Sequence, residues 1–226
     1  MSIQIITGTY GCGKTNYAVN LAMQQRAERK EVTLIDLDTV NPYYRSFDFQ
    51  AFLQQYGISL IAPVFAGTNL DLPAITGEIA AALQNREQVI IDIGGDDAGA
   101  VVLGGYNKMI QNRLYEVSYL VNPYRTQTNT AREALTVMRN IEIASKLPVT
   151  TIVGNPNLGE MTTAEDIYAA LPELLLFSKL SGLPFSSILV EESLALKLQL
   201  ERIPIPVRPI TRFARGGAAA DYSQQI

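Results

Sequence analysis

Short apolar runs rich in β-branched residues alternate along the chain with longer stretches of helical character. Most of the runs are apolar at consecutive positions, as in parallel strands that are buried on both faces of a sheet. They predict strands over Ile3–Thr7, Val32–Asp36, Leu60–Phe65, Val89–Asp92, Val117–Val121, Val149–Val153, Ile188–Val190 and Ile205–Arg208.

The stretches between these runs predict helices. They cover Lys14–Arg29, Ala74–Arg86, Gly99–Arg113, Thr128–Ser145, Thr163–Leu180 and Glu192–Leu200. Thr162 and Glu165 have the spacing of a capping box at one helix start. Strands and helices that alternate at these lengths predict right-handed crossovers and a three-layer α/β/α fold of the P-loop NTPase type, with a mostly parallel sheet. No linker or repeat divides the 226 residues, so we expect a single domain over 1–226.

The turn after the first predicted strand carries the strongest chemical signal. Residues 8–15 read GTYGCGKT and match G-x-x-x-x-G-K-[ST] in full. Glycines let backbone N–H groups point at phosphate oxygens beside the positive end of the following helix. Lys14 adds a cation for the β- and γ-phosphates, and the Thr15 hydroxyl can ligate Mg²⁺. The alternative is a glycine-rich turn that binds nothing. We expect ATP and Mg²⁺ here, with nucleotide contacts from Gly8, Tyr10, Gly11, Cys12, Gly13, Lys14, Thr15 and Asn16.

Acidic residues follow two further predicted strands. Asp36 and Asp38 stand at the end of the second strand, and Asp92 ends the apolar run of the fourth, as in a Walker-B strand. Ligands of open α/β sheets bind beyond the carboxyl ends of the strands. These acids could hold magnesium or orient an attacking water, and the Gly95 N–H could sense the γ-phosphate. The alternative is that the acids are solvated loop residues.

Asn155 follows the sixth predicted strand, in the segment Gly154–Asn157. Its amide offers donors and an acceptor, which suits the edge of adenine, whereas a guanine reader would be expected to show Asn-Lys-x-Asp here. An ordinary Asn-Pro turn is the alternative. Cys12 has two interpretations as well: a thiol activated at a helix N-terminus, or a small residue that fills the loop.

Charge and composition exclude several classes of function. The net charge of −4 gives no global attraction to nucleic acid or anionic lipid, so a nucleic-acid partner is not expected. With one cysteine and no histidine, the chain can form neither an internal disulfide nor a His/Cys metal cage. We find no signal-peptide pattern and no apolar run long enough for a bilayer, so we expect a cytoplasmic protein without a membrane anchor.

Four motifs together resemble the MinD/ParA/CobQ/CobB class of nucleotide-binding proteins, part of the SIMIBI group. They are GTYGCGKT, VTLIDLD followed by TVNPYYRS, VIIDIGGDD, and the strand that leads to GNPN, within positions 8–157. The resemblance implies ATP binding, slow hydrolysis and a nucleotide-dependent homodimer. It assigns Lys14 to the phosphates, Thr15 and Asp36 to the magnesium sphere, Asp38 to the attacking water, Asp92 to the Walker-B role and Asn155 to adenine.

The chain departs from this class at Thr9. Many members carry there a lysine that reaches the partner subunit's nucleotide, so that route of activation is unavailable. Arg45, in the segment after Asp38, is the residue that we expect to approach a γ-phosphate or the opposing subunit. Three functions remain open: a regulatory ATPase with an unknown protein partner, an ATP-dependent small-molecule kinase or ligase, and a nucleotide-binding module without turnover.

Overall fold

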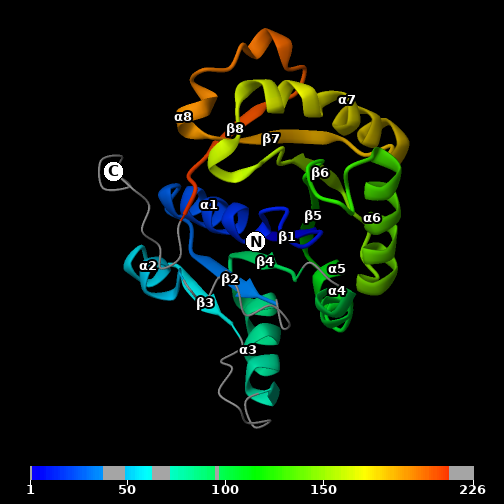
Figure 1. Cartoon of the computed structure of the whole chain (residues 1–226). Coiled ribbons are helices and arrows are strands. Elements are labelled where there is room, and N and C mark those ends of the chain that lie inside the picture. The colour runs from blue at the N-terminus through cyan, green and yellow to red at the C-terminus, as the bar shows by residue number, and fades with distance from the viewer. Residues whose placement is uncertain (1, 38–48, 63–71, 95–96, 214–226) are drawn as a thin grey trace.

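The computed structural model describes residues 2–37, 49–62, 72–94 and 97–213 (Figure 1). Eight strands form one sheet in the order β3-β2-β4-β1-β5-β6-β7-β8, and every pairing between them is parallel. The strands are β1 (Ser2–Gly8), β2 (Val32–Asp36), β3 (Ser59–Ile61), β4 (Gln88–Asp92), β5 (Leu114–Val121), β6 (Thr151–Gly154), β7 (Phe185–Glu191) and β8 (Val207–Ile210). The predicted parallel sheet is confirmed.

Two strands begin later than the sequence predicts. β6 begins at Thr151 because the N–H of Val149 donates to a carboxylate oxygen of Glu142 (2.8 Å) instead of joining the ladder. β8 begins after Pro206, which has no N–H to donate. β3 ends at Ile61, and the last three residues of the strand predicted there lie outside the described residues.

The helices cover most of the predicted positions. They are α1 (Lys14–Ala27), α2 (Gln50–Gln55), α3 (Leu72–Asn85), α4 (Asp97–Gly104), α5 (Asn107–Gln111), α6 (Ala131–Ser145), α7 (Ala164–Ser181) and α8 (Glu192–Ala195), with 3₁₀ turns at Gly159–Met161 and Leu200–Arg202. The short helix α2 was not predicted. The helix predicted from Glu192 to Leu200 is wrong beyond Ala195, where α8 ends.

The single helix predicted over Gly99–Arg113 is two helices. A β-carbon on Gly104 would lie 2.7 Å from the carbonyl oxygen of Ala144 in α6, so α4 and α6 touch backbone to backbone at its end. There the chain tightens, and the N–H of Tyr106 donates to the Leu103 carbonyl (2.9 Å). The helix therefore stops at Gly104 and restarts at Asn107.

The capping box of α7 lies one residue later than predicted. Thr163 is the N-cap, its side chain accepts a hydrogen bond from the Asp166 N–H, and the Asp166 carboxylate accepts one from the Thr163 N–H. The Thr162 hydroxyl serves the preceding 3₁₀ turn instead, because it donates to the Gly159 carbonyl (2.8 Å) and accepts from the Leu158 N–H (2.9 Å).

Alternate residues of each strand face opposite layers. On β4, Val89 and Ile91 belong to the apolar cluster that contains residues of α3 to α7, whereas Ile90 belongs to the cluster that contains α1 and α2. β7 repeats the pattern with Leu189 between Ile188 and Val190. The two helical layers on either side of the sheet confirm the three-layer fold (Figure 1).

All strands point the same way, so their carboxyl ends share one edge of the sheet. β1 lies between β4 and β5, and the chain passes to β2 on one side before it returns to the other. Asp36 and Asp92 are direct partners in the β2–β4 register. The side chains that follow the strands therefore gather beyond this edge, where open α/β sheets bind ligands.

Candidate functional site

The loop between β1 and α1 ends at a position that requires glycine. Gly13 is the N-cap of α1 and has a φ of 98°, in the left-handed region that favours glycine. A β-carbon there would also lie 2.4 Å from Nδ2 of Asn155. Any other residue at position 13 would therefore strain the loop and displace the Asn155 amide.

Lys14 is folded back into this loop. Its Nζ donates to the Thr9 carbonyl (2.9 Å), and only 7% of the residue is exposed. A buried ammonium needs a partner, and here that partner is a single neutral oxygen. Phosphate oxygens would be stronger acceptors for the same group.

Thr15 is joined to Asp92, for which the sequence predicts the Walker-B role. Its hydroxyl donates to Oδ2 of Asp92 (2.7 Å). Asp92 and its register partner Asp36 are almost fully buried, at 1% and 2% exposure. The structure thus gathers all three residues predicted to hold magnesium beneath the start of α1.

The thiol of Cys12 packs in the core rather than facing the site. The residue is fully buried in the cluster beneath α1. Burial raises the pKa of its thiol, and the nearby positive charge of Lys14 only partly opposes this. The environment is that of a small packing residue. Its neighbour Tyr10 is 61% exposed, so the two loop residues face opposite ways.

Asn155 connects the end of β6 to the loop. Its Nδ2 donates to the Cys12 carbonyl (2.7 Å), while its buried Oδ1 has no hydrogen-bond partner among the described residues. Asn16 uses its amide differently: Nδ2 donates to the Thr211 carbonyl (3.1 Å), and Oδ1 accepts from the Phe213 N–H (3.0 Å). Asn16 therefore holds the chain after β8 against α1.

A cavity of about 240 Å³ opens beside the loop. Its lining includes Asn155 and four polar side chains that were not among the predicted site residues: Asn122, Asn157, Glu191 and Arg212. Glu191 is the last residue of β7, and the other three follow β5, β6 and β8 at the carboxyl edge of the sheet. A polar residue at or after the end of a buried strand is the sequence signal that they share with the aspartates and Asn155.

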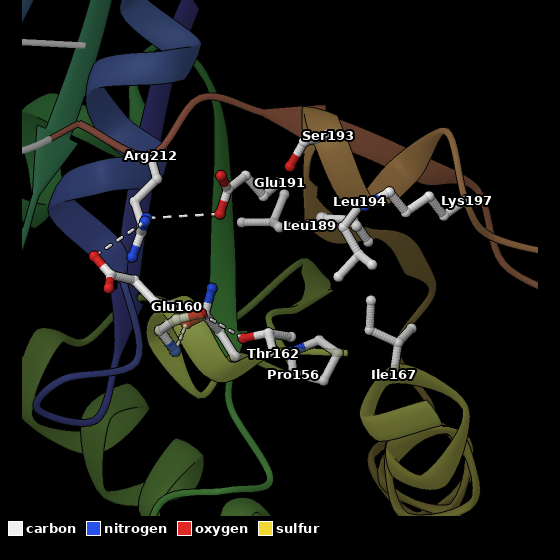
Figure 2. A pocket seen from close by; sticks show the side chains of 13 residues that line it. Pro156, Glu160, Thr162, Ile167, Leu189, Glu191, Ser193, Leu194, Lys197 and Arg212 are labelled. Atoms are coloured by element: carbon white, nitrogen blue, oxygen red, sulfur yellow. Dashed lines mark hydrogen bonds and ion pairs between the residues drawn. The ribbon is translucent and has the colours of Figure 1, made fainter. Parts of the chain in front are cut away.

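A second cavity, of about 230 Å³, adjoins the first and shares Asn157, Glu191 and Arg212 with it (Figure 2). Arg212 lies between two carboxylates, 3.4 Å from Glu160 and 3.5 Å from Glu191. Its guanidinium thus bridges the ends of β7 and β8 and the turn after β6. These residues are far apart in sequence, so no local sequence pattern predicts that they meet.

Some predicted site residues lie outside the described residues: Asp38, Gly95 and the segment from Asn41 to Arg45. Their roles stay predictions. Within the part of the chain that is described, no group of three or more His, Cys, Asp or Glu side chains could hold a metal alone. No helix there has the length and apolar character needed to cross a bilayer.

No protein-family model matches the chain, and no curated protein matches its sequence. Solved structures do match its fold. The cell division protein FtsY of Thermotoga maritima superposes with a TM-score of 0.60 at 20% identity and covers 84% of this chain. FtsY of Elizabethkingia anophelis in complex with GDP superposes with a TM-score of 0.55 at 19% identity and covers 84% of this chain. The signal recognition particle 54 kDa protein of Aeropyrum pernix, also in complex with GDP, has a TM-score of 0.53 at 18% identity and covers 81% of this chain.

The likeness confirms an α/β fold shared with these P-loop proteins. The chain spans 62%, 57% and 40% of the three proteins' own lengths. At 20% identity or less, the match establishes the architecture, and the function must come from the site.

Proposed function

We propose that this chain binds ATP with Mg²⁺ on the loop from Gly8 to Thr15 and is a slow regulatory ATPase of the MinD/ParA/CobQ/CobB type. The observation that carries the proposal is the hydrogen bond from the Thr15 hydroxyl to Asp92 (2.7 Å), at the end of a loop whose lysine is buried within it. A turn that binds nothing would not need a cation and two buried carboxylates at its base.

The side chains fit magnesium and a triphosphate together. Thr15, Asp36 and Asp92 offer oxygen atoms, which Mg²⁺ prefers, but too few to fill an octahedral shell. Phosphate oxygens and water would supply the rest. When bound, the metal would neutralise charge on the phosphates. Lys14 would exchange the Thr9 carbonyl for phosphate oxygens, and the N–H groups at the start of α1 would donate to the same anion.

The cavity beside the loop supports adenine as the base. The free acceptor Oδ1 of Asn155 suits an amino group such as that of adenine, and the amide is held in place through Cys12. No carboxylate stands in the segment from Asn155 to Leu158 that could accept from guanine.

GTP is the second candidate, and two observations favour it. The carboxylate of Glu191 lines the cavity and could accept from the N1–H and N2–H groups of guanine. Two of the structural neighbours are complexes with GDP. Against this, Glu191 already faces Arg212 at 3.5 Å, which would compete with the base.

Calorimetry with ATP and GTP, each with Mg²⁺ and with EDTA, tests the proposal. We expect ATP to bind about tenfold more tightly than GTP, since a mismatched base edge costs about 1–3 kcal/mol. Tighter GTP binding would select the second candidate, and binding of neither nucleotide would refute both. Lys14→Ala should abolish binding without a change in circular dichroism.

Phosphate release separates the three modes of action. A regulatory ATPase should release phosphate slowly from ATP alone. A kinase or ligase should show turnover only when small-molecule acceptors are added, and a binding module should show none in either case.

A further inference from the structure

Arg125 places a positive charge directly beside the phosphate loop. A β-carbon built on Gly11 would lie 3.3 Å from Cζ, 3.5 Å from Nε and 3.6 Å from Nη2 of Arg125. The guanidinium therefore lies beside the α-carbon of Gly11, in the middle of GTYGCGKT. This arginine is 114 positions later in the chain, and no sequence motif marks it.

The N–H donors of the Arg125 guanidinium are unused within the described residues. Arg125 is exposed, no described carboxylate lies within ion-pair distance of it, and its side chain donates no hydrogen bond to any described residue. A guanidinium carries five N–H donors in a planar fork that matches phosphate oxygens. Beside a loop built to receive an anion, such a cation is available for the same ligand.

Hydrogen bonds within the loop that carries Arg125 fix its backbone. The Arg125 N–H donates to the Asn122 carbonyl (3.1 Å), and its own carbonyl accepts from the Thr128 N–H (2.9 Å). The Thr128 hydroxyl closes the loop with a bond to the Asn122 carbonyl (2.7 Å). Asn122 and Thr128 are each only 1% exposed, so the base of the loop is part of the core.

Neighbouring elements anchor the same loop. Nδ2 of Asn122 donates to the Asn157 carbonyl (2.9 Å), and the Tyr124 hydroxyl donates to the Asp166 carbonyl (2.5 Å) in α7. The backbone of Arg125 is therefore positioned by the turn after β6 and by α7, while its side chain stays exposed at Gly11. This is how a rigid scaffold presents a binding residue.

We propose that Arg125 binds the phosphate chain of the nucleotide, in addition to the buried Lys14. The inference rests on the proposed function and extends it by one binding residue. It gives the chain a second cation at the phosphates although Thr9 stands at the position of the class's additional lysine. Arg125 reaches the loop of its own subunit, so this contact needs no dimer.

Calorimetry on the full chain tests the inference with three probes: ATP·Mg²⁺, inorganic tripolyphosphate and adenosine. Arg125→Ala should weaken ATP·Mg²⁺ and tripolyphosphate by about tenfold or more, as expected for the loss of charge-assisted hydrogen bonds, and leave adenosine unchanged. The affinities of Arg125→Lys should fall between those of wild type and Arg125→Ala, because lysine keeps the charge and lacks the planar fork of N–H donors. Arg139→Ala, at an exposed arginine on α6, is the matched control and should bind as wild type.

The outcomes separate this inference from the proposed function. If wild type binds ATP and Arg125→Ala binds ATP and tripolyphosphate equally well or more tightly, the inference is wrong and the proposed function stands. If wild type binds tripolyphosphate through Arg125 but neither ATP nor GTP, both are wrong, and Arg125 serves a phosphate ligand other than these nucleotides. If wild type binds none of these ligands, both are wrong. Equal melting temperatures of Arg125→Ala and wild type would show that the variant is folded.

Discussion

The side-chain amide of Asn155 donates a hydrogen bond of 2.7 Å to the backbone carbonyl of Cys12, 143 residues earlier in the chain. Both residues are buried, and the bond ties the end of β6 to the middle of the phosphate loop. The same amide fills the space where a β-carbon of Gly13 would be. The shape of the loop therefore depends on a residue that its own sequence motif does not contain.

Asn155→Ala should destabilise the fold and weaken ATP binding together. The Cys12 carbonyl would lose its partner in a buried site, which costs about 1–3 kcal/mol. We expect a loss of that size in the free energy of unfolding by urea, with a lower ATP affinity by calorimetry. Asn140→Ala, at an exposed position on α6, is the control. Unchanged stability would show that the bond is dispensable.

Asp92→Asn should weaken the magnesium-dependent part of ATP binding. The amide can still accept from the Thr15 hydroxyl, so the loop keeps its hydrogen bond while the site loses a negative charge. The ATP affinity should fall by about tenfold or more with Mg²⁺ and change little in EDTA. Thr15→Ala should show the same dependence. Equal losses with and without the metal would place Asp92 in the loop's architecture instead.

Asp38→Asn tests the one proposed catalytic residue that lies outside the described residues. If Asp38 orients the attacking water, the variant should bind ATP·Mg²⁺ normally and release phosphate more slowly, because an amide orients water without accepting its proton. A coupled phosphate assay measures the rate, and calorimetry checks the affinity. Hydrolysis at the wild-type rate would mean that Asp38 is a loop acid.

The sequence was most informative where local chemistry decides the structure. Apolar runs placed β1, β2 and β4 closely, and G-x-x-x-x-G-K-[ST] identified the loop, since both signals are contiguous. The sequence was least informative where tertiary contacts determine the structure. Gly104 interrupts a helix because α6 touches it, and Arg125 and Arg212 reach the site only through the order of the strands. No local sequence pattern predicts such contacts.

Acid should remove part of the stability that the α7 cap provides. Hydrogen bonds from Thr163 hold the pKa of Asp166 below its ordinary value of 3.8. The folded state thus binds this proton less readily than the unfolded state, so the stabilisation is present above 3.8 and is lost as the pH falls through the lower folded value. Asp166→Asn should lower the free energy of unfolding at pH 7.

The difference between Asp166→Asn and wild type should shrink as urea unfolding is repeated from about pH 5 down to about pH 2, over which a carboxylate of lowered pKa takes up its proton. Glu78→Gln, at an exposed position on α3, should show no such trend. A difference that does not depend on pH would mean that the charge of Asp166 contributes nothing to the cap.

Cys12 is the only cysteine of the chain, so a thiol reagent reports on the phosphate loop alone. The side chain is fully buried and burial raises the pKa of the thiol, so the reactive thiolate is both scarce and shielded. At pH 8 a maleimide should react far more slowly with the native protein than with the protein in guanidinium, where one equivalent should be consumed.

Saturating ATP·Mg²⁺ should slow the native reaction further, because a ligand that binds only the closed loop reduces the population in which Cys12 is accessible. Adenosine, which lacks the phosphates, is the matched control and should protect much less. Rapid labelling of the native protein would show that the loop opens freely. Slow labelling that ATP·Mg²⁺ leaves unchanged would mean that Cys12 becomes accessible by a motion other than opening of the nucleotide site.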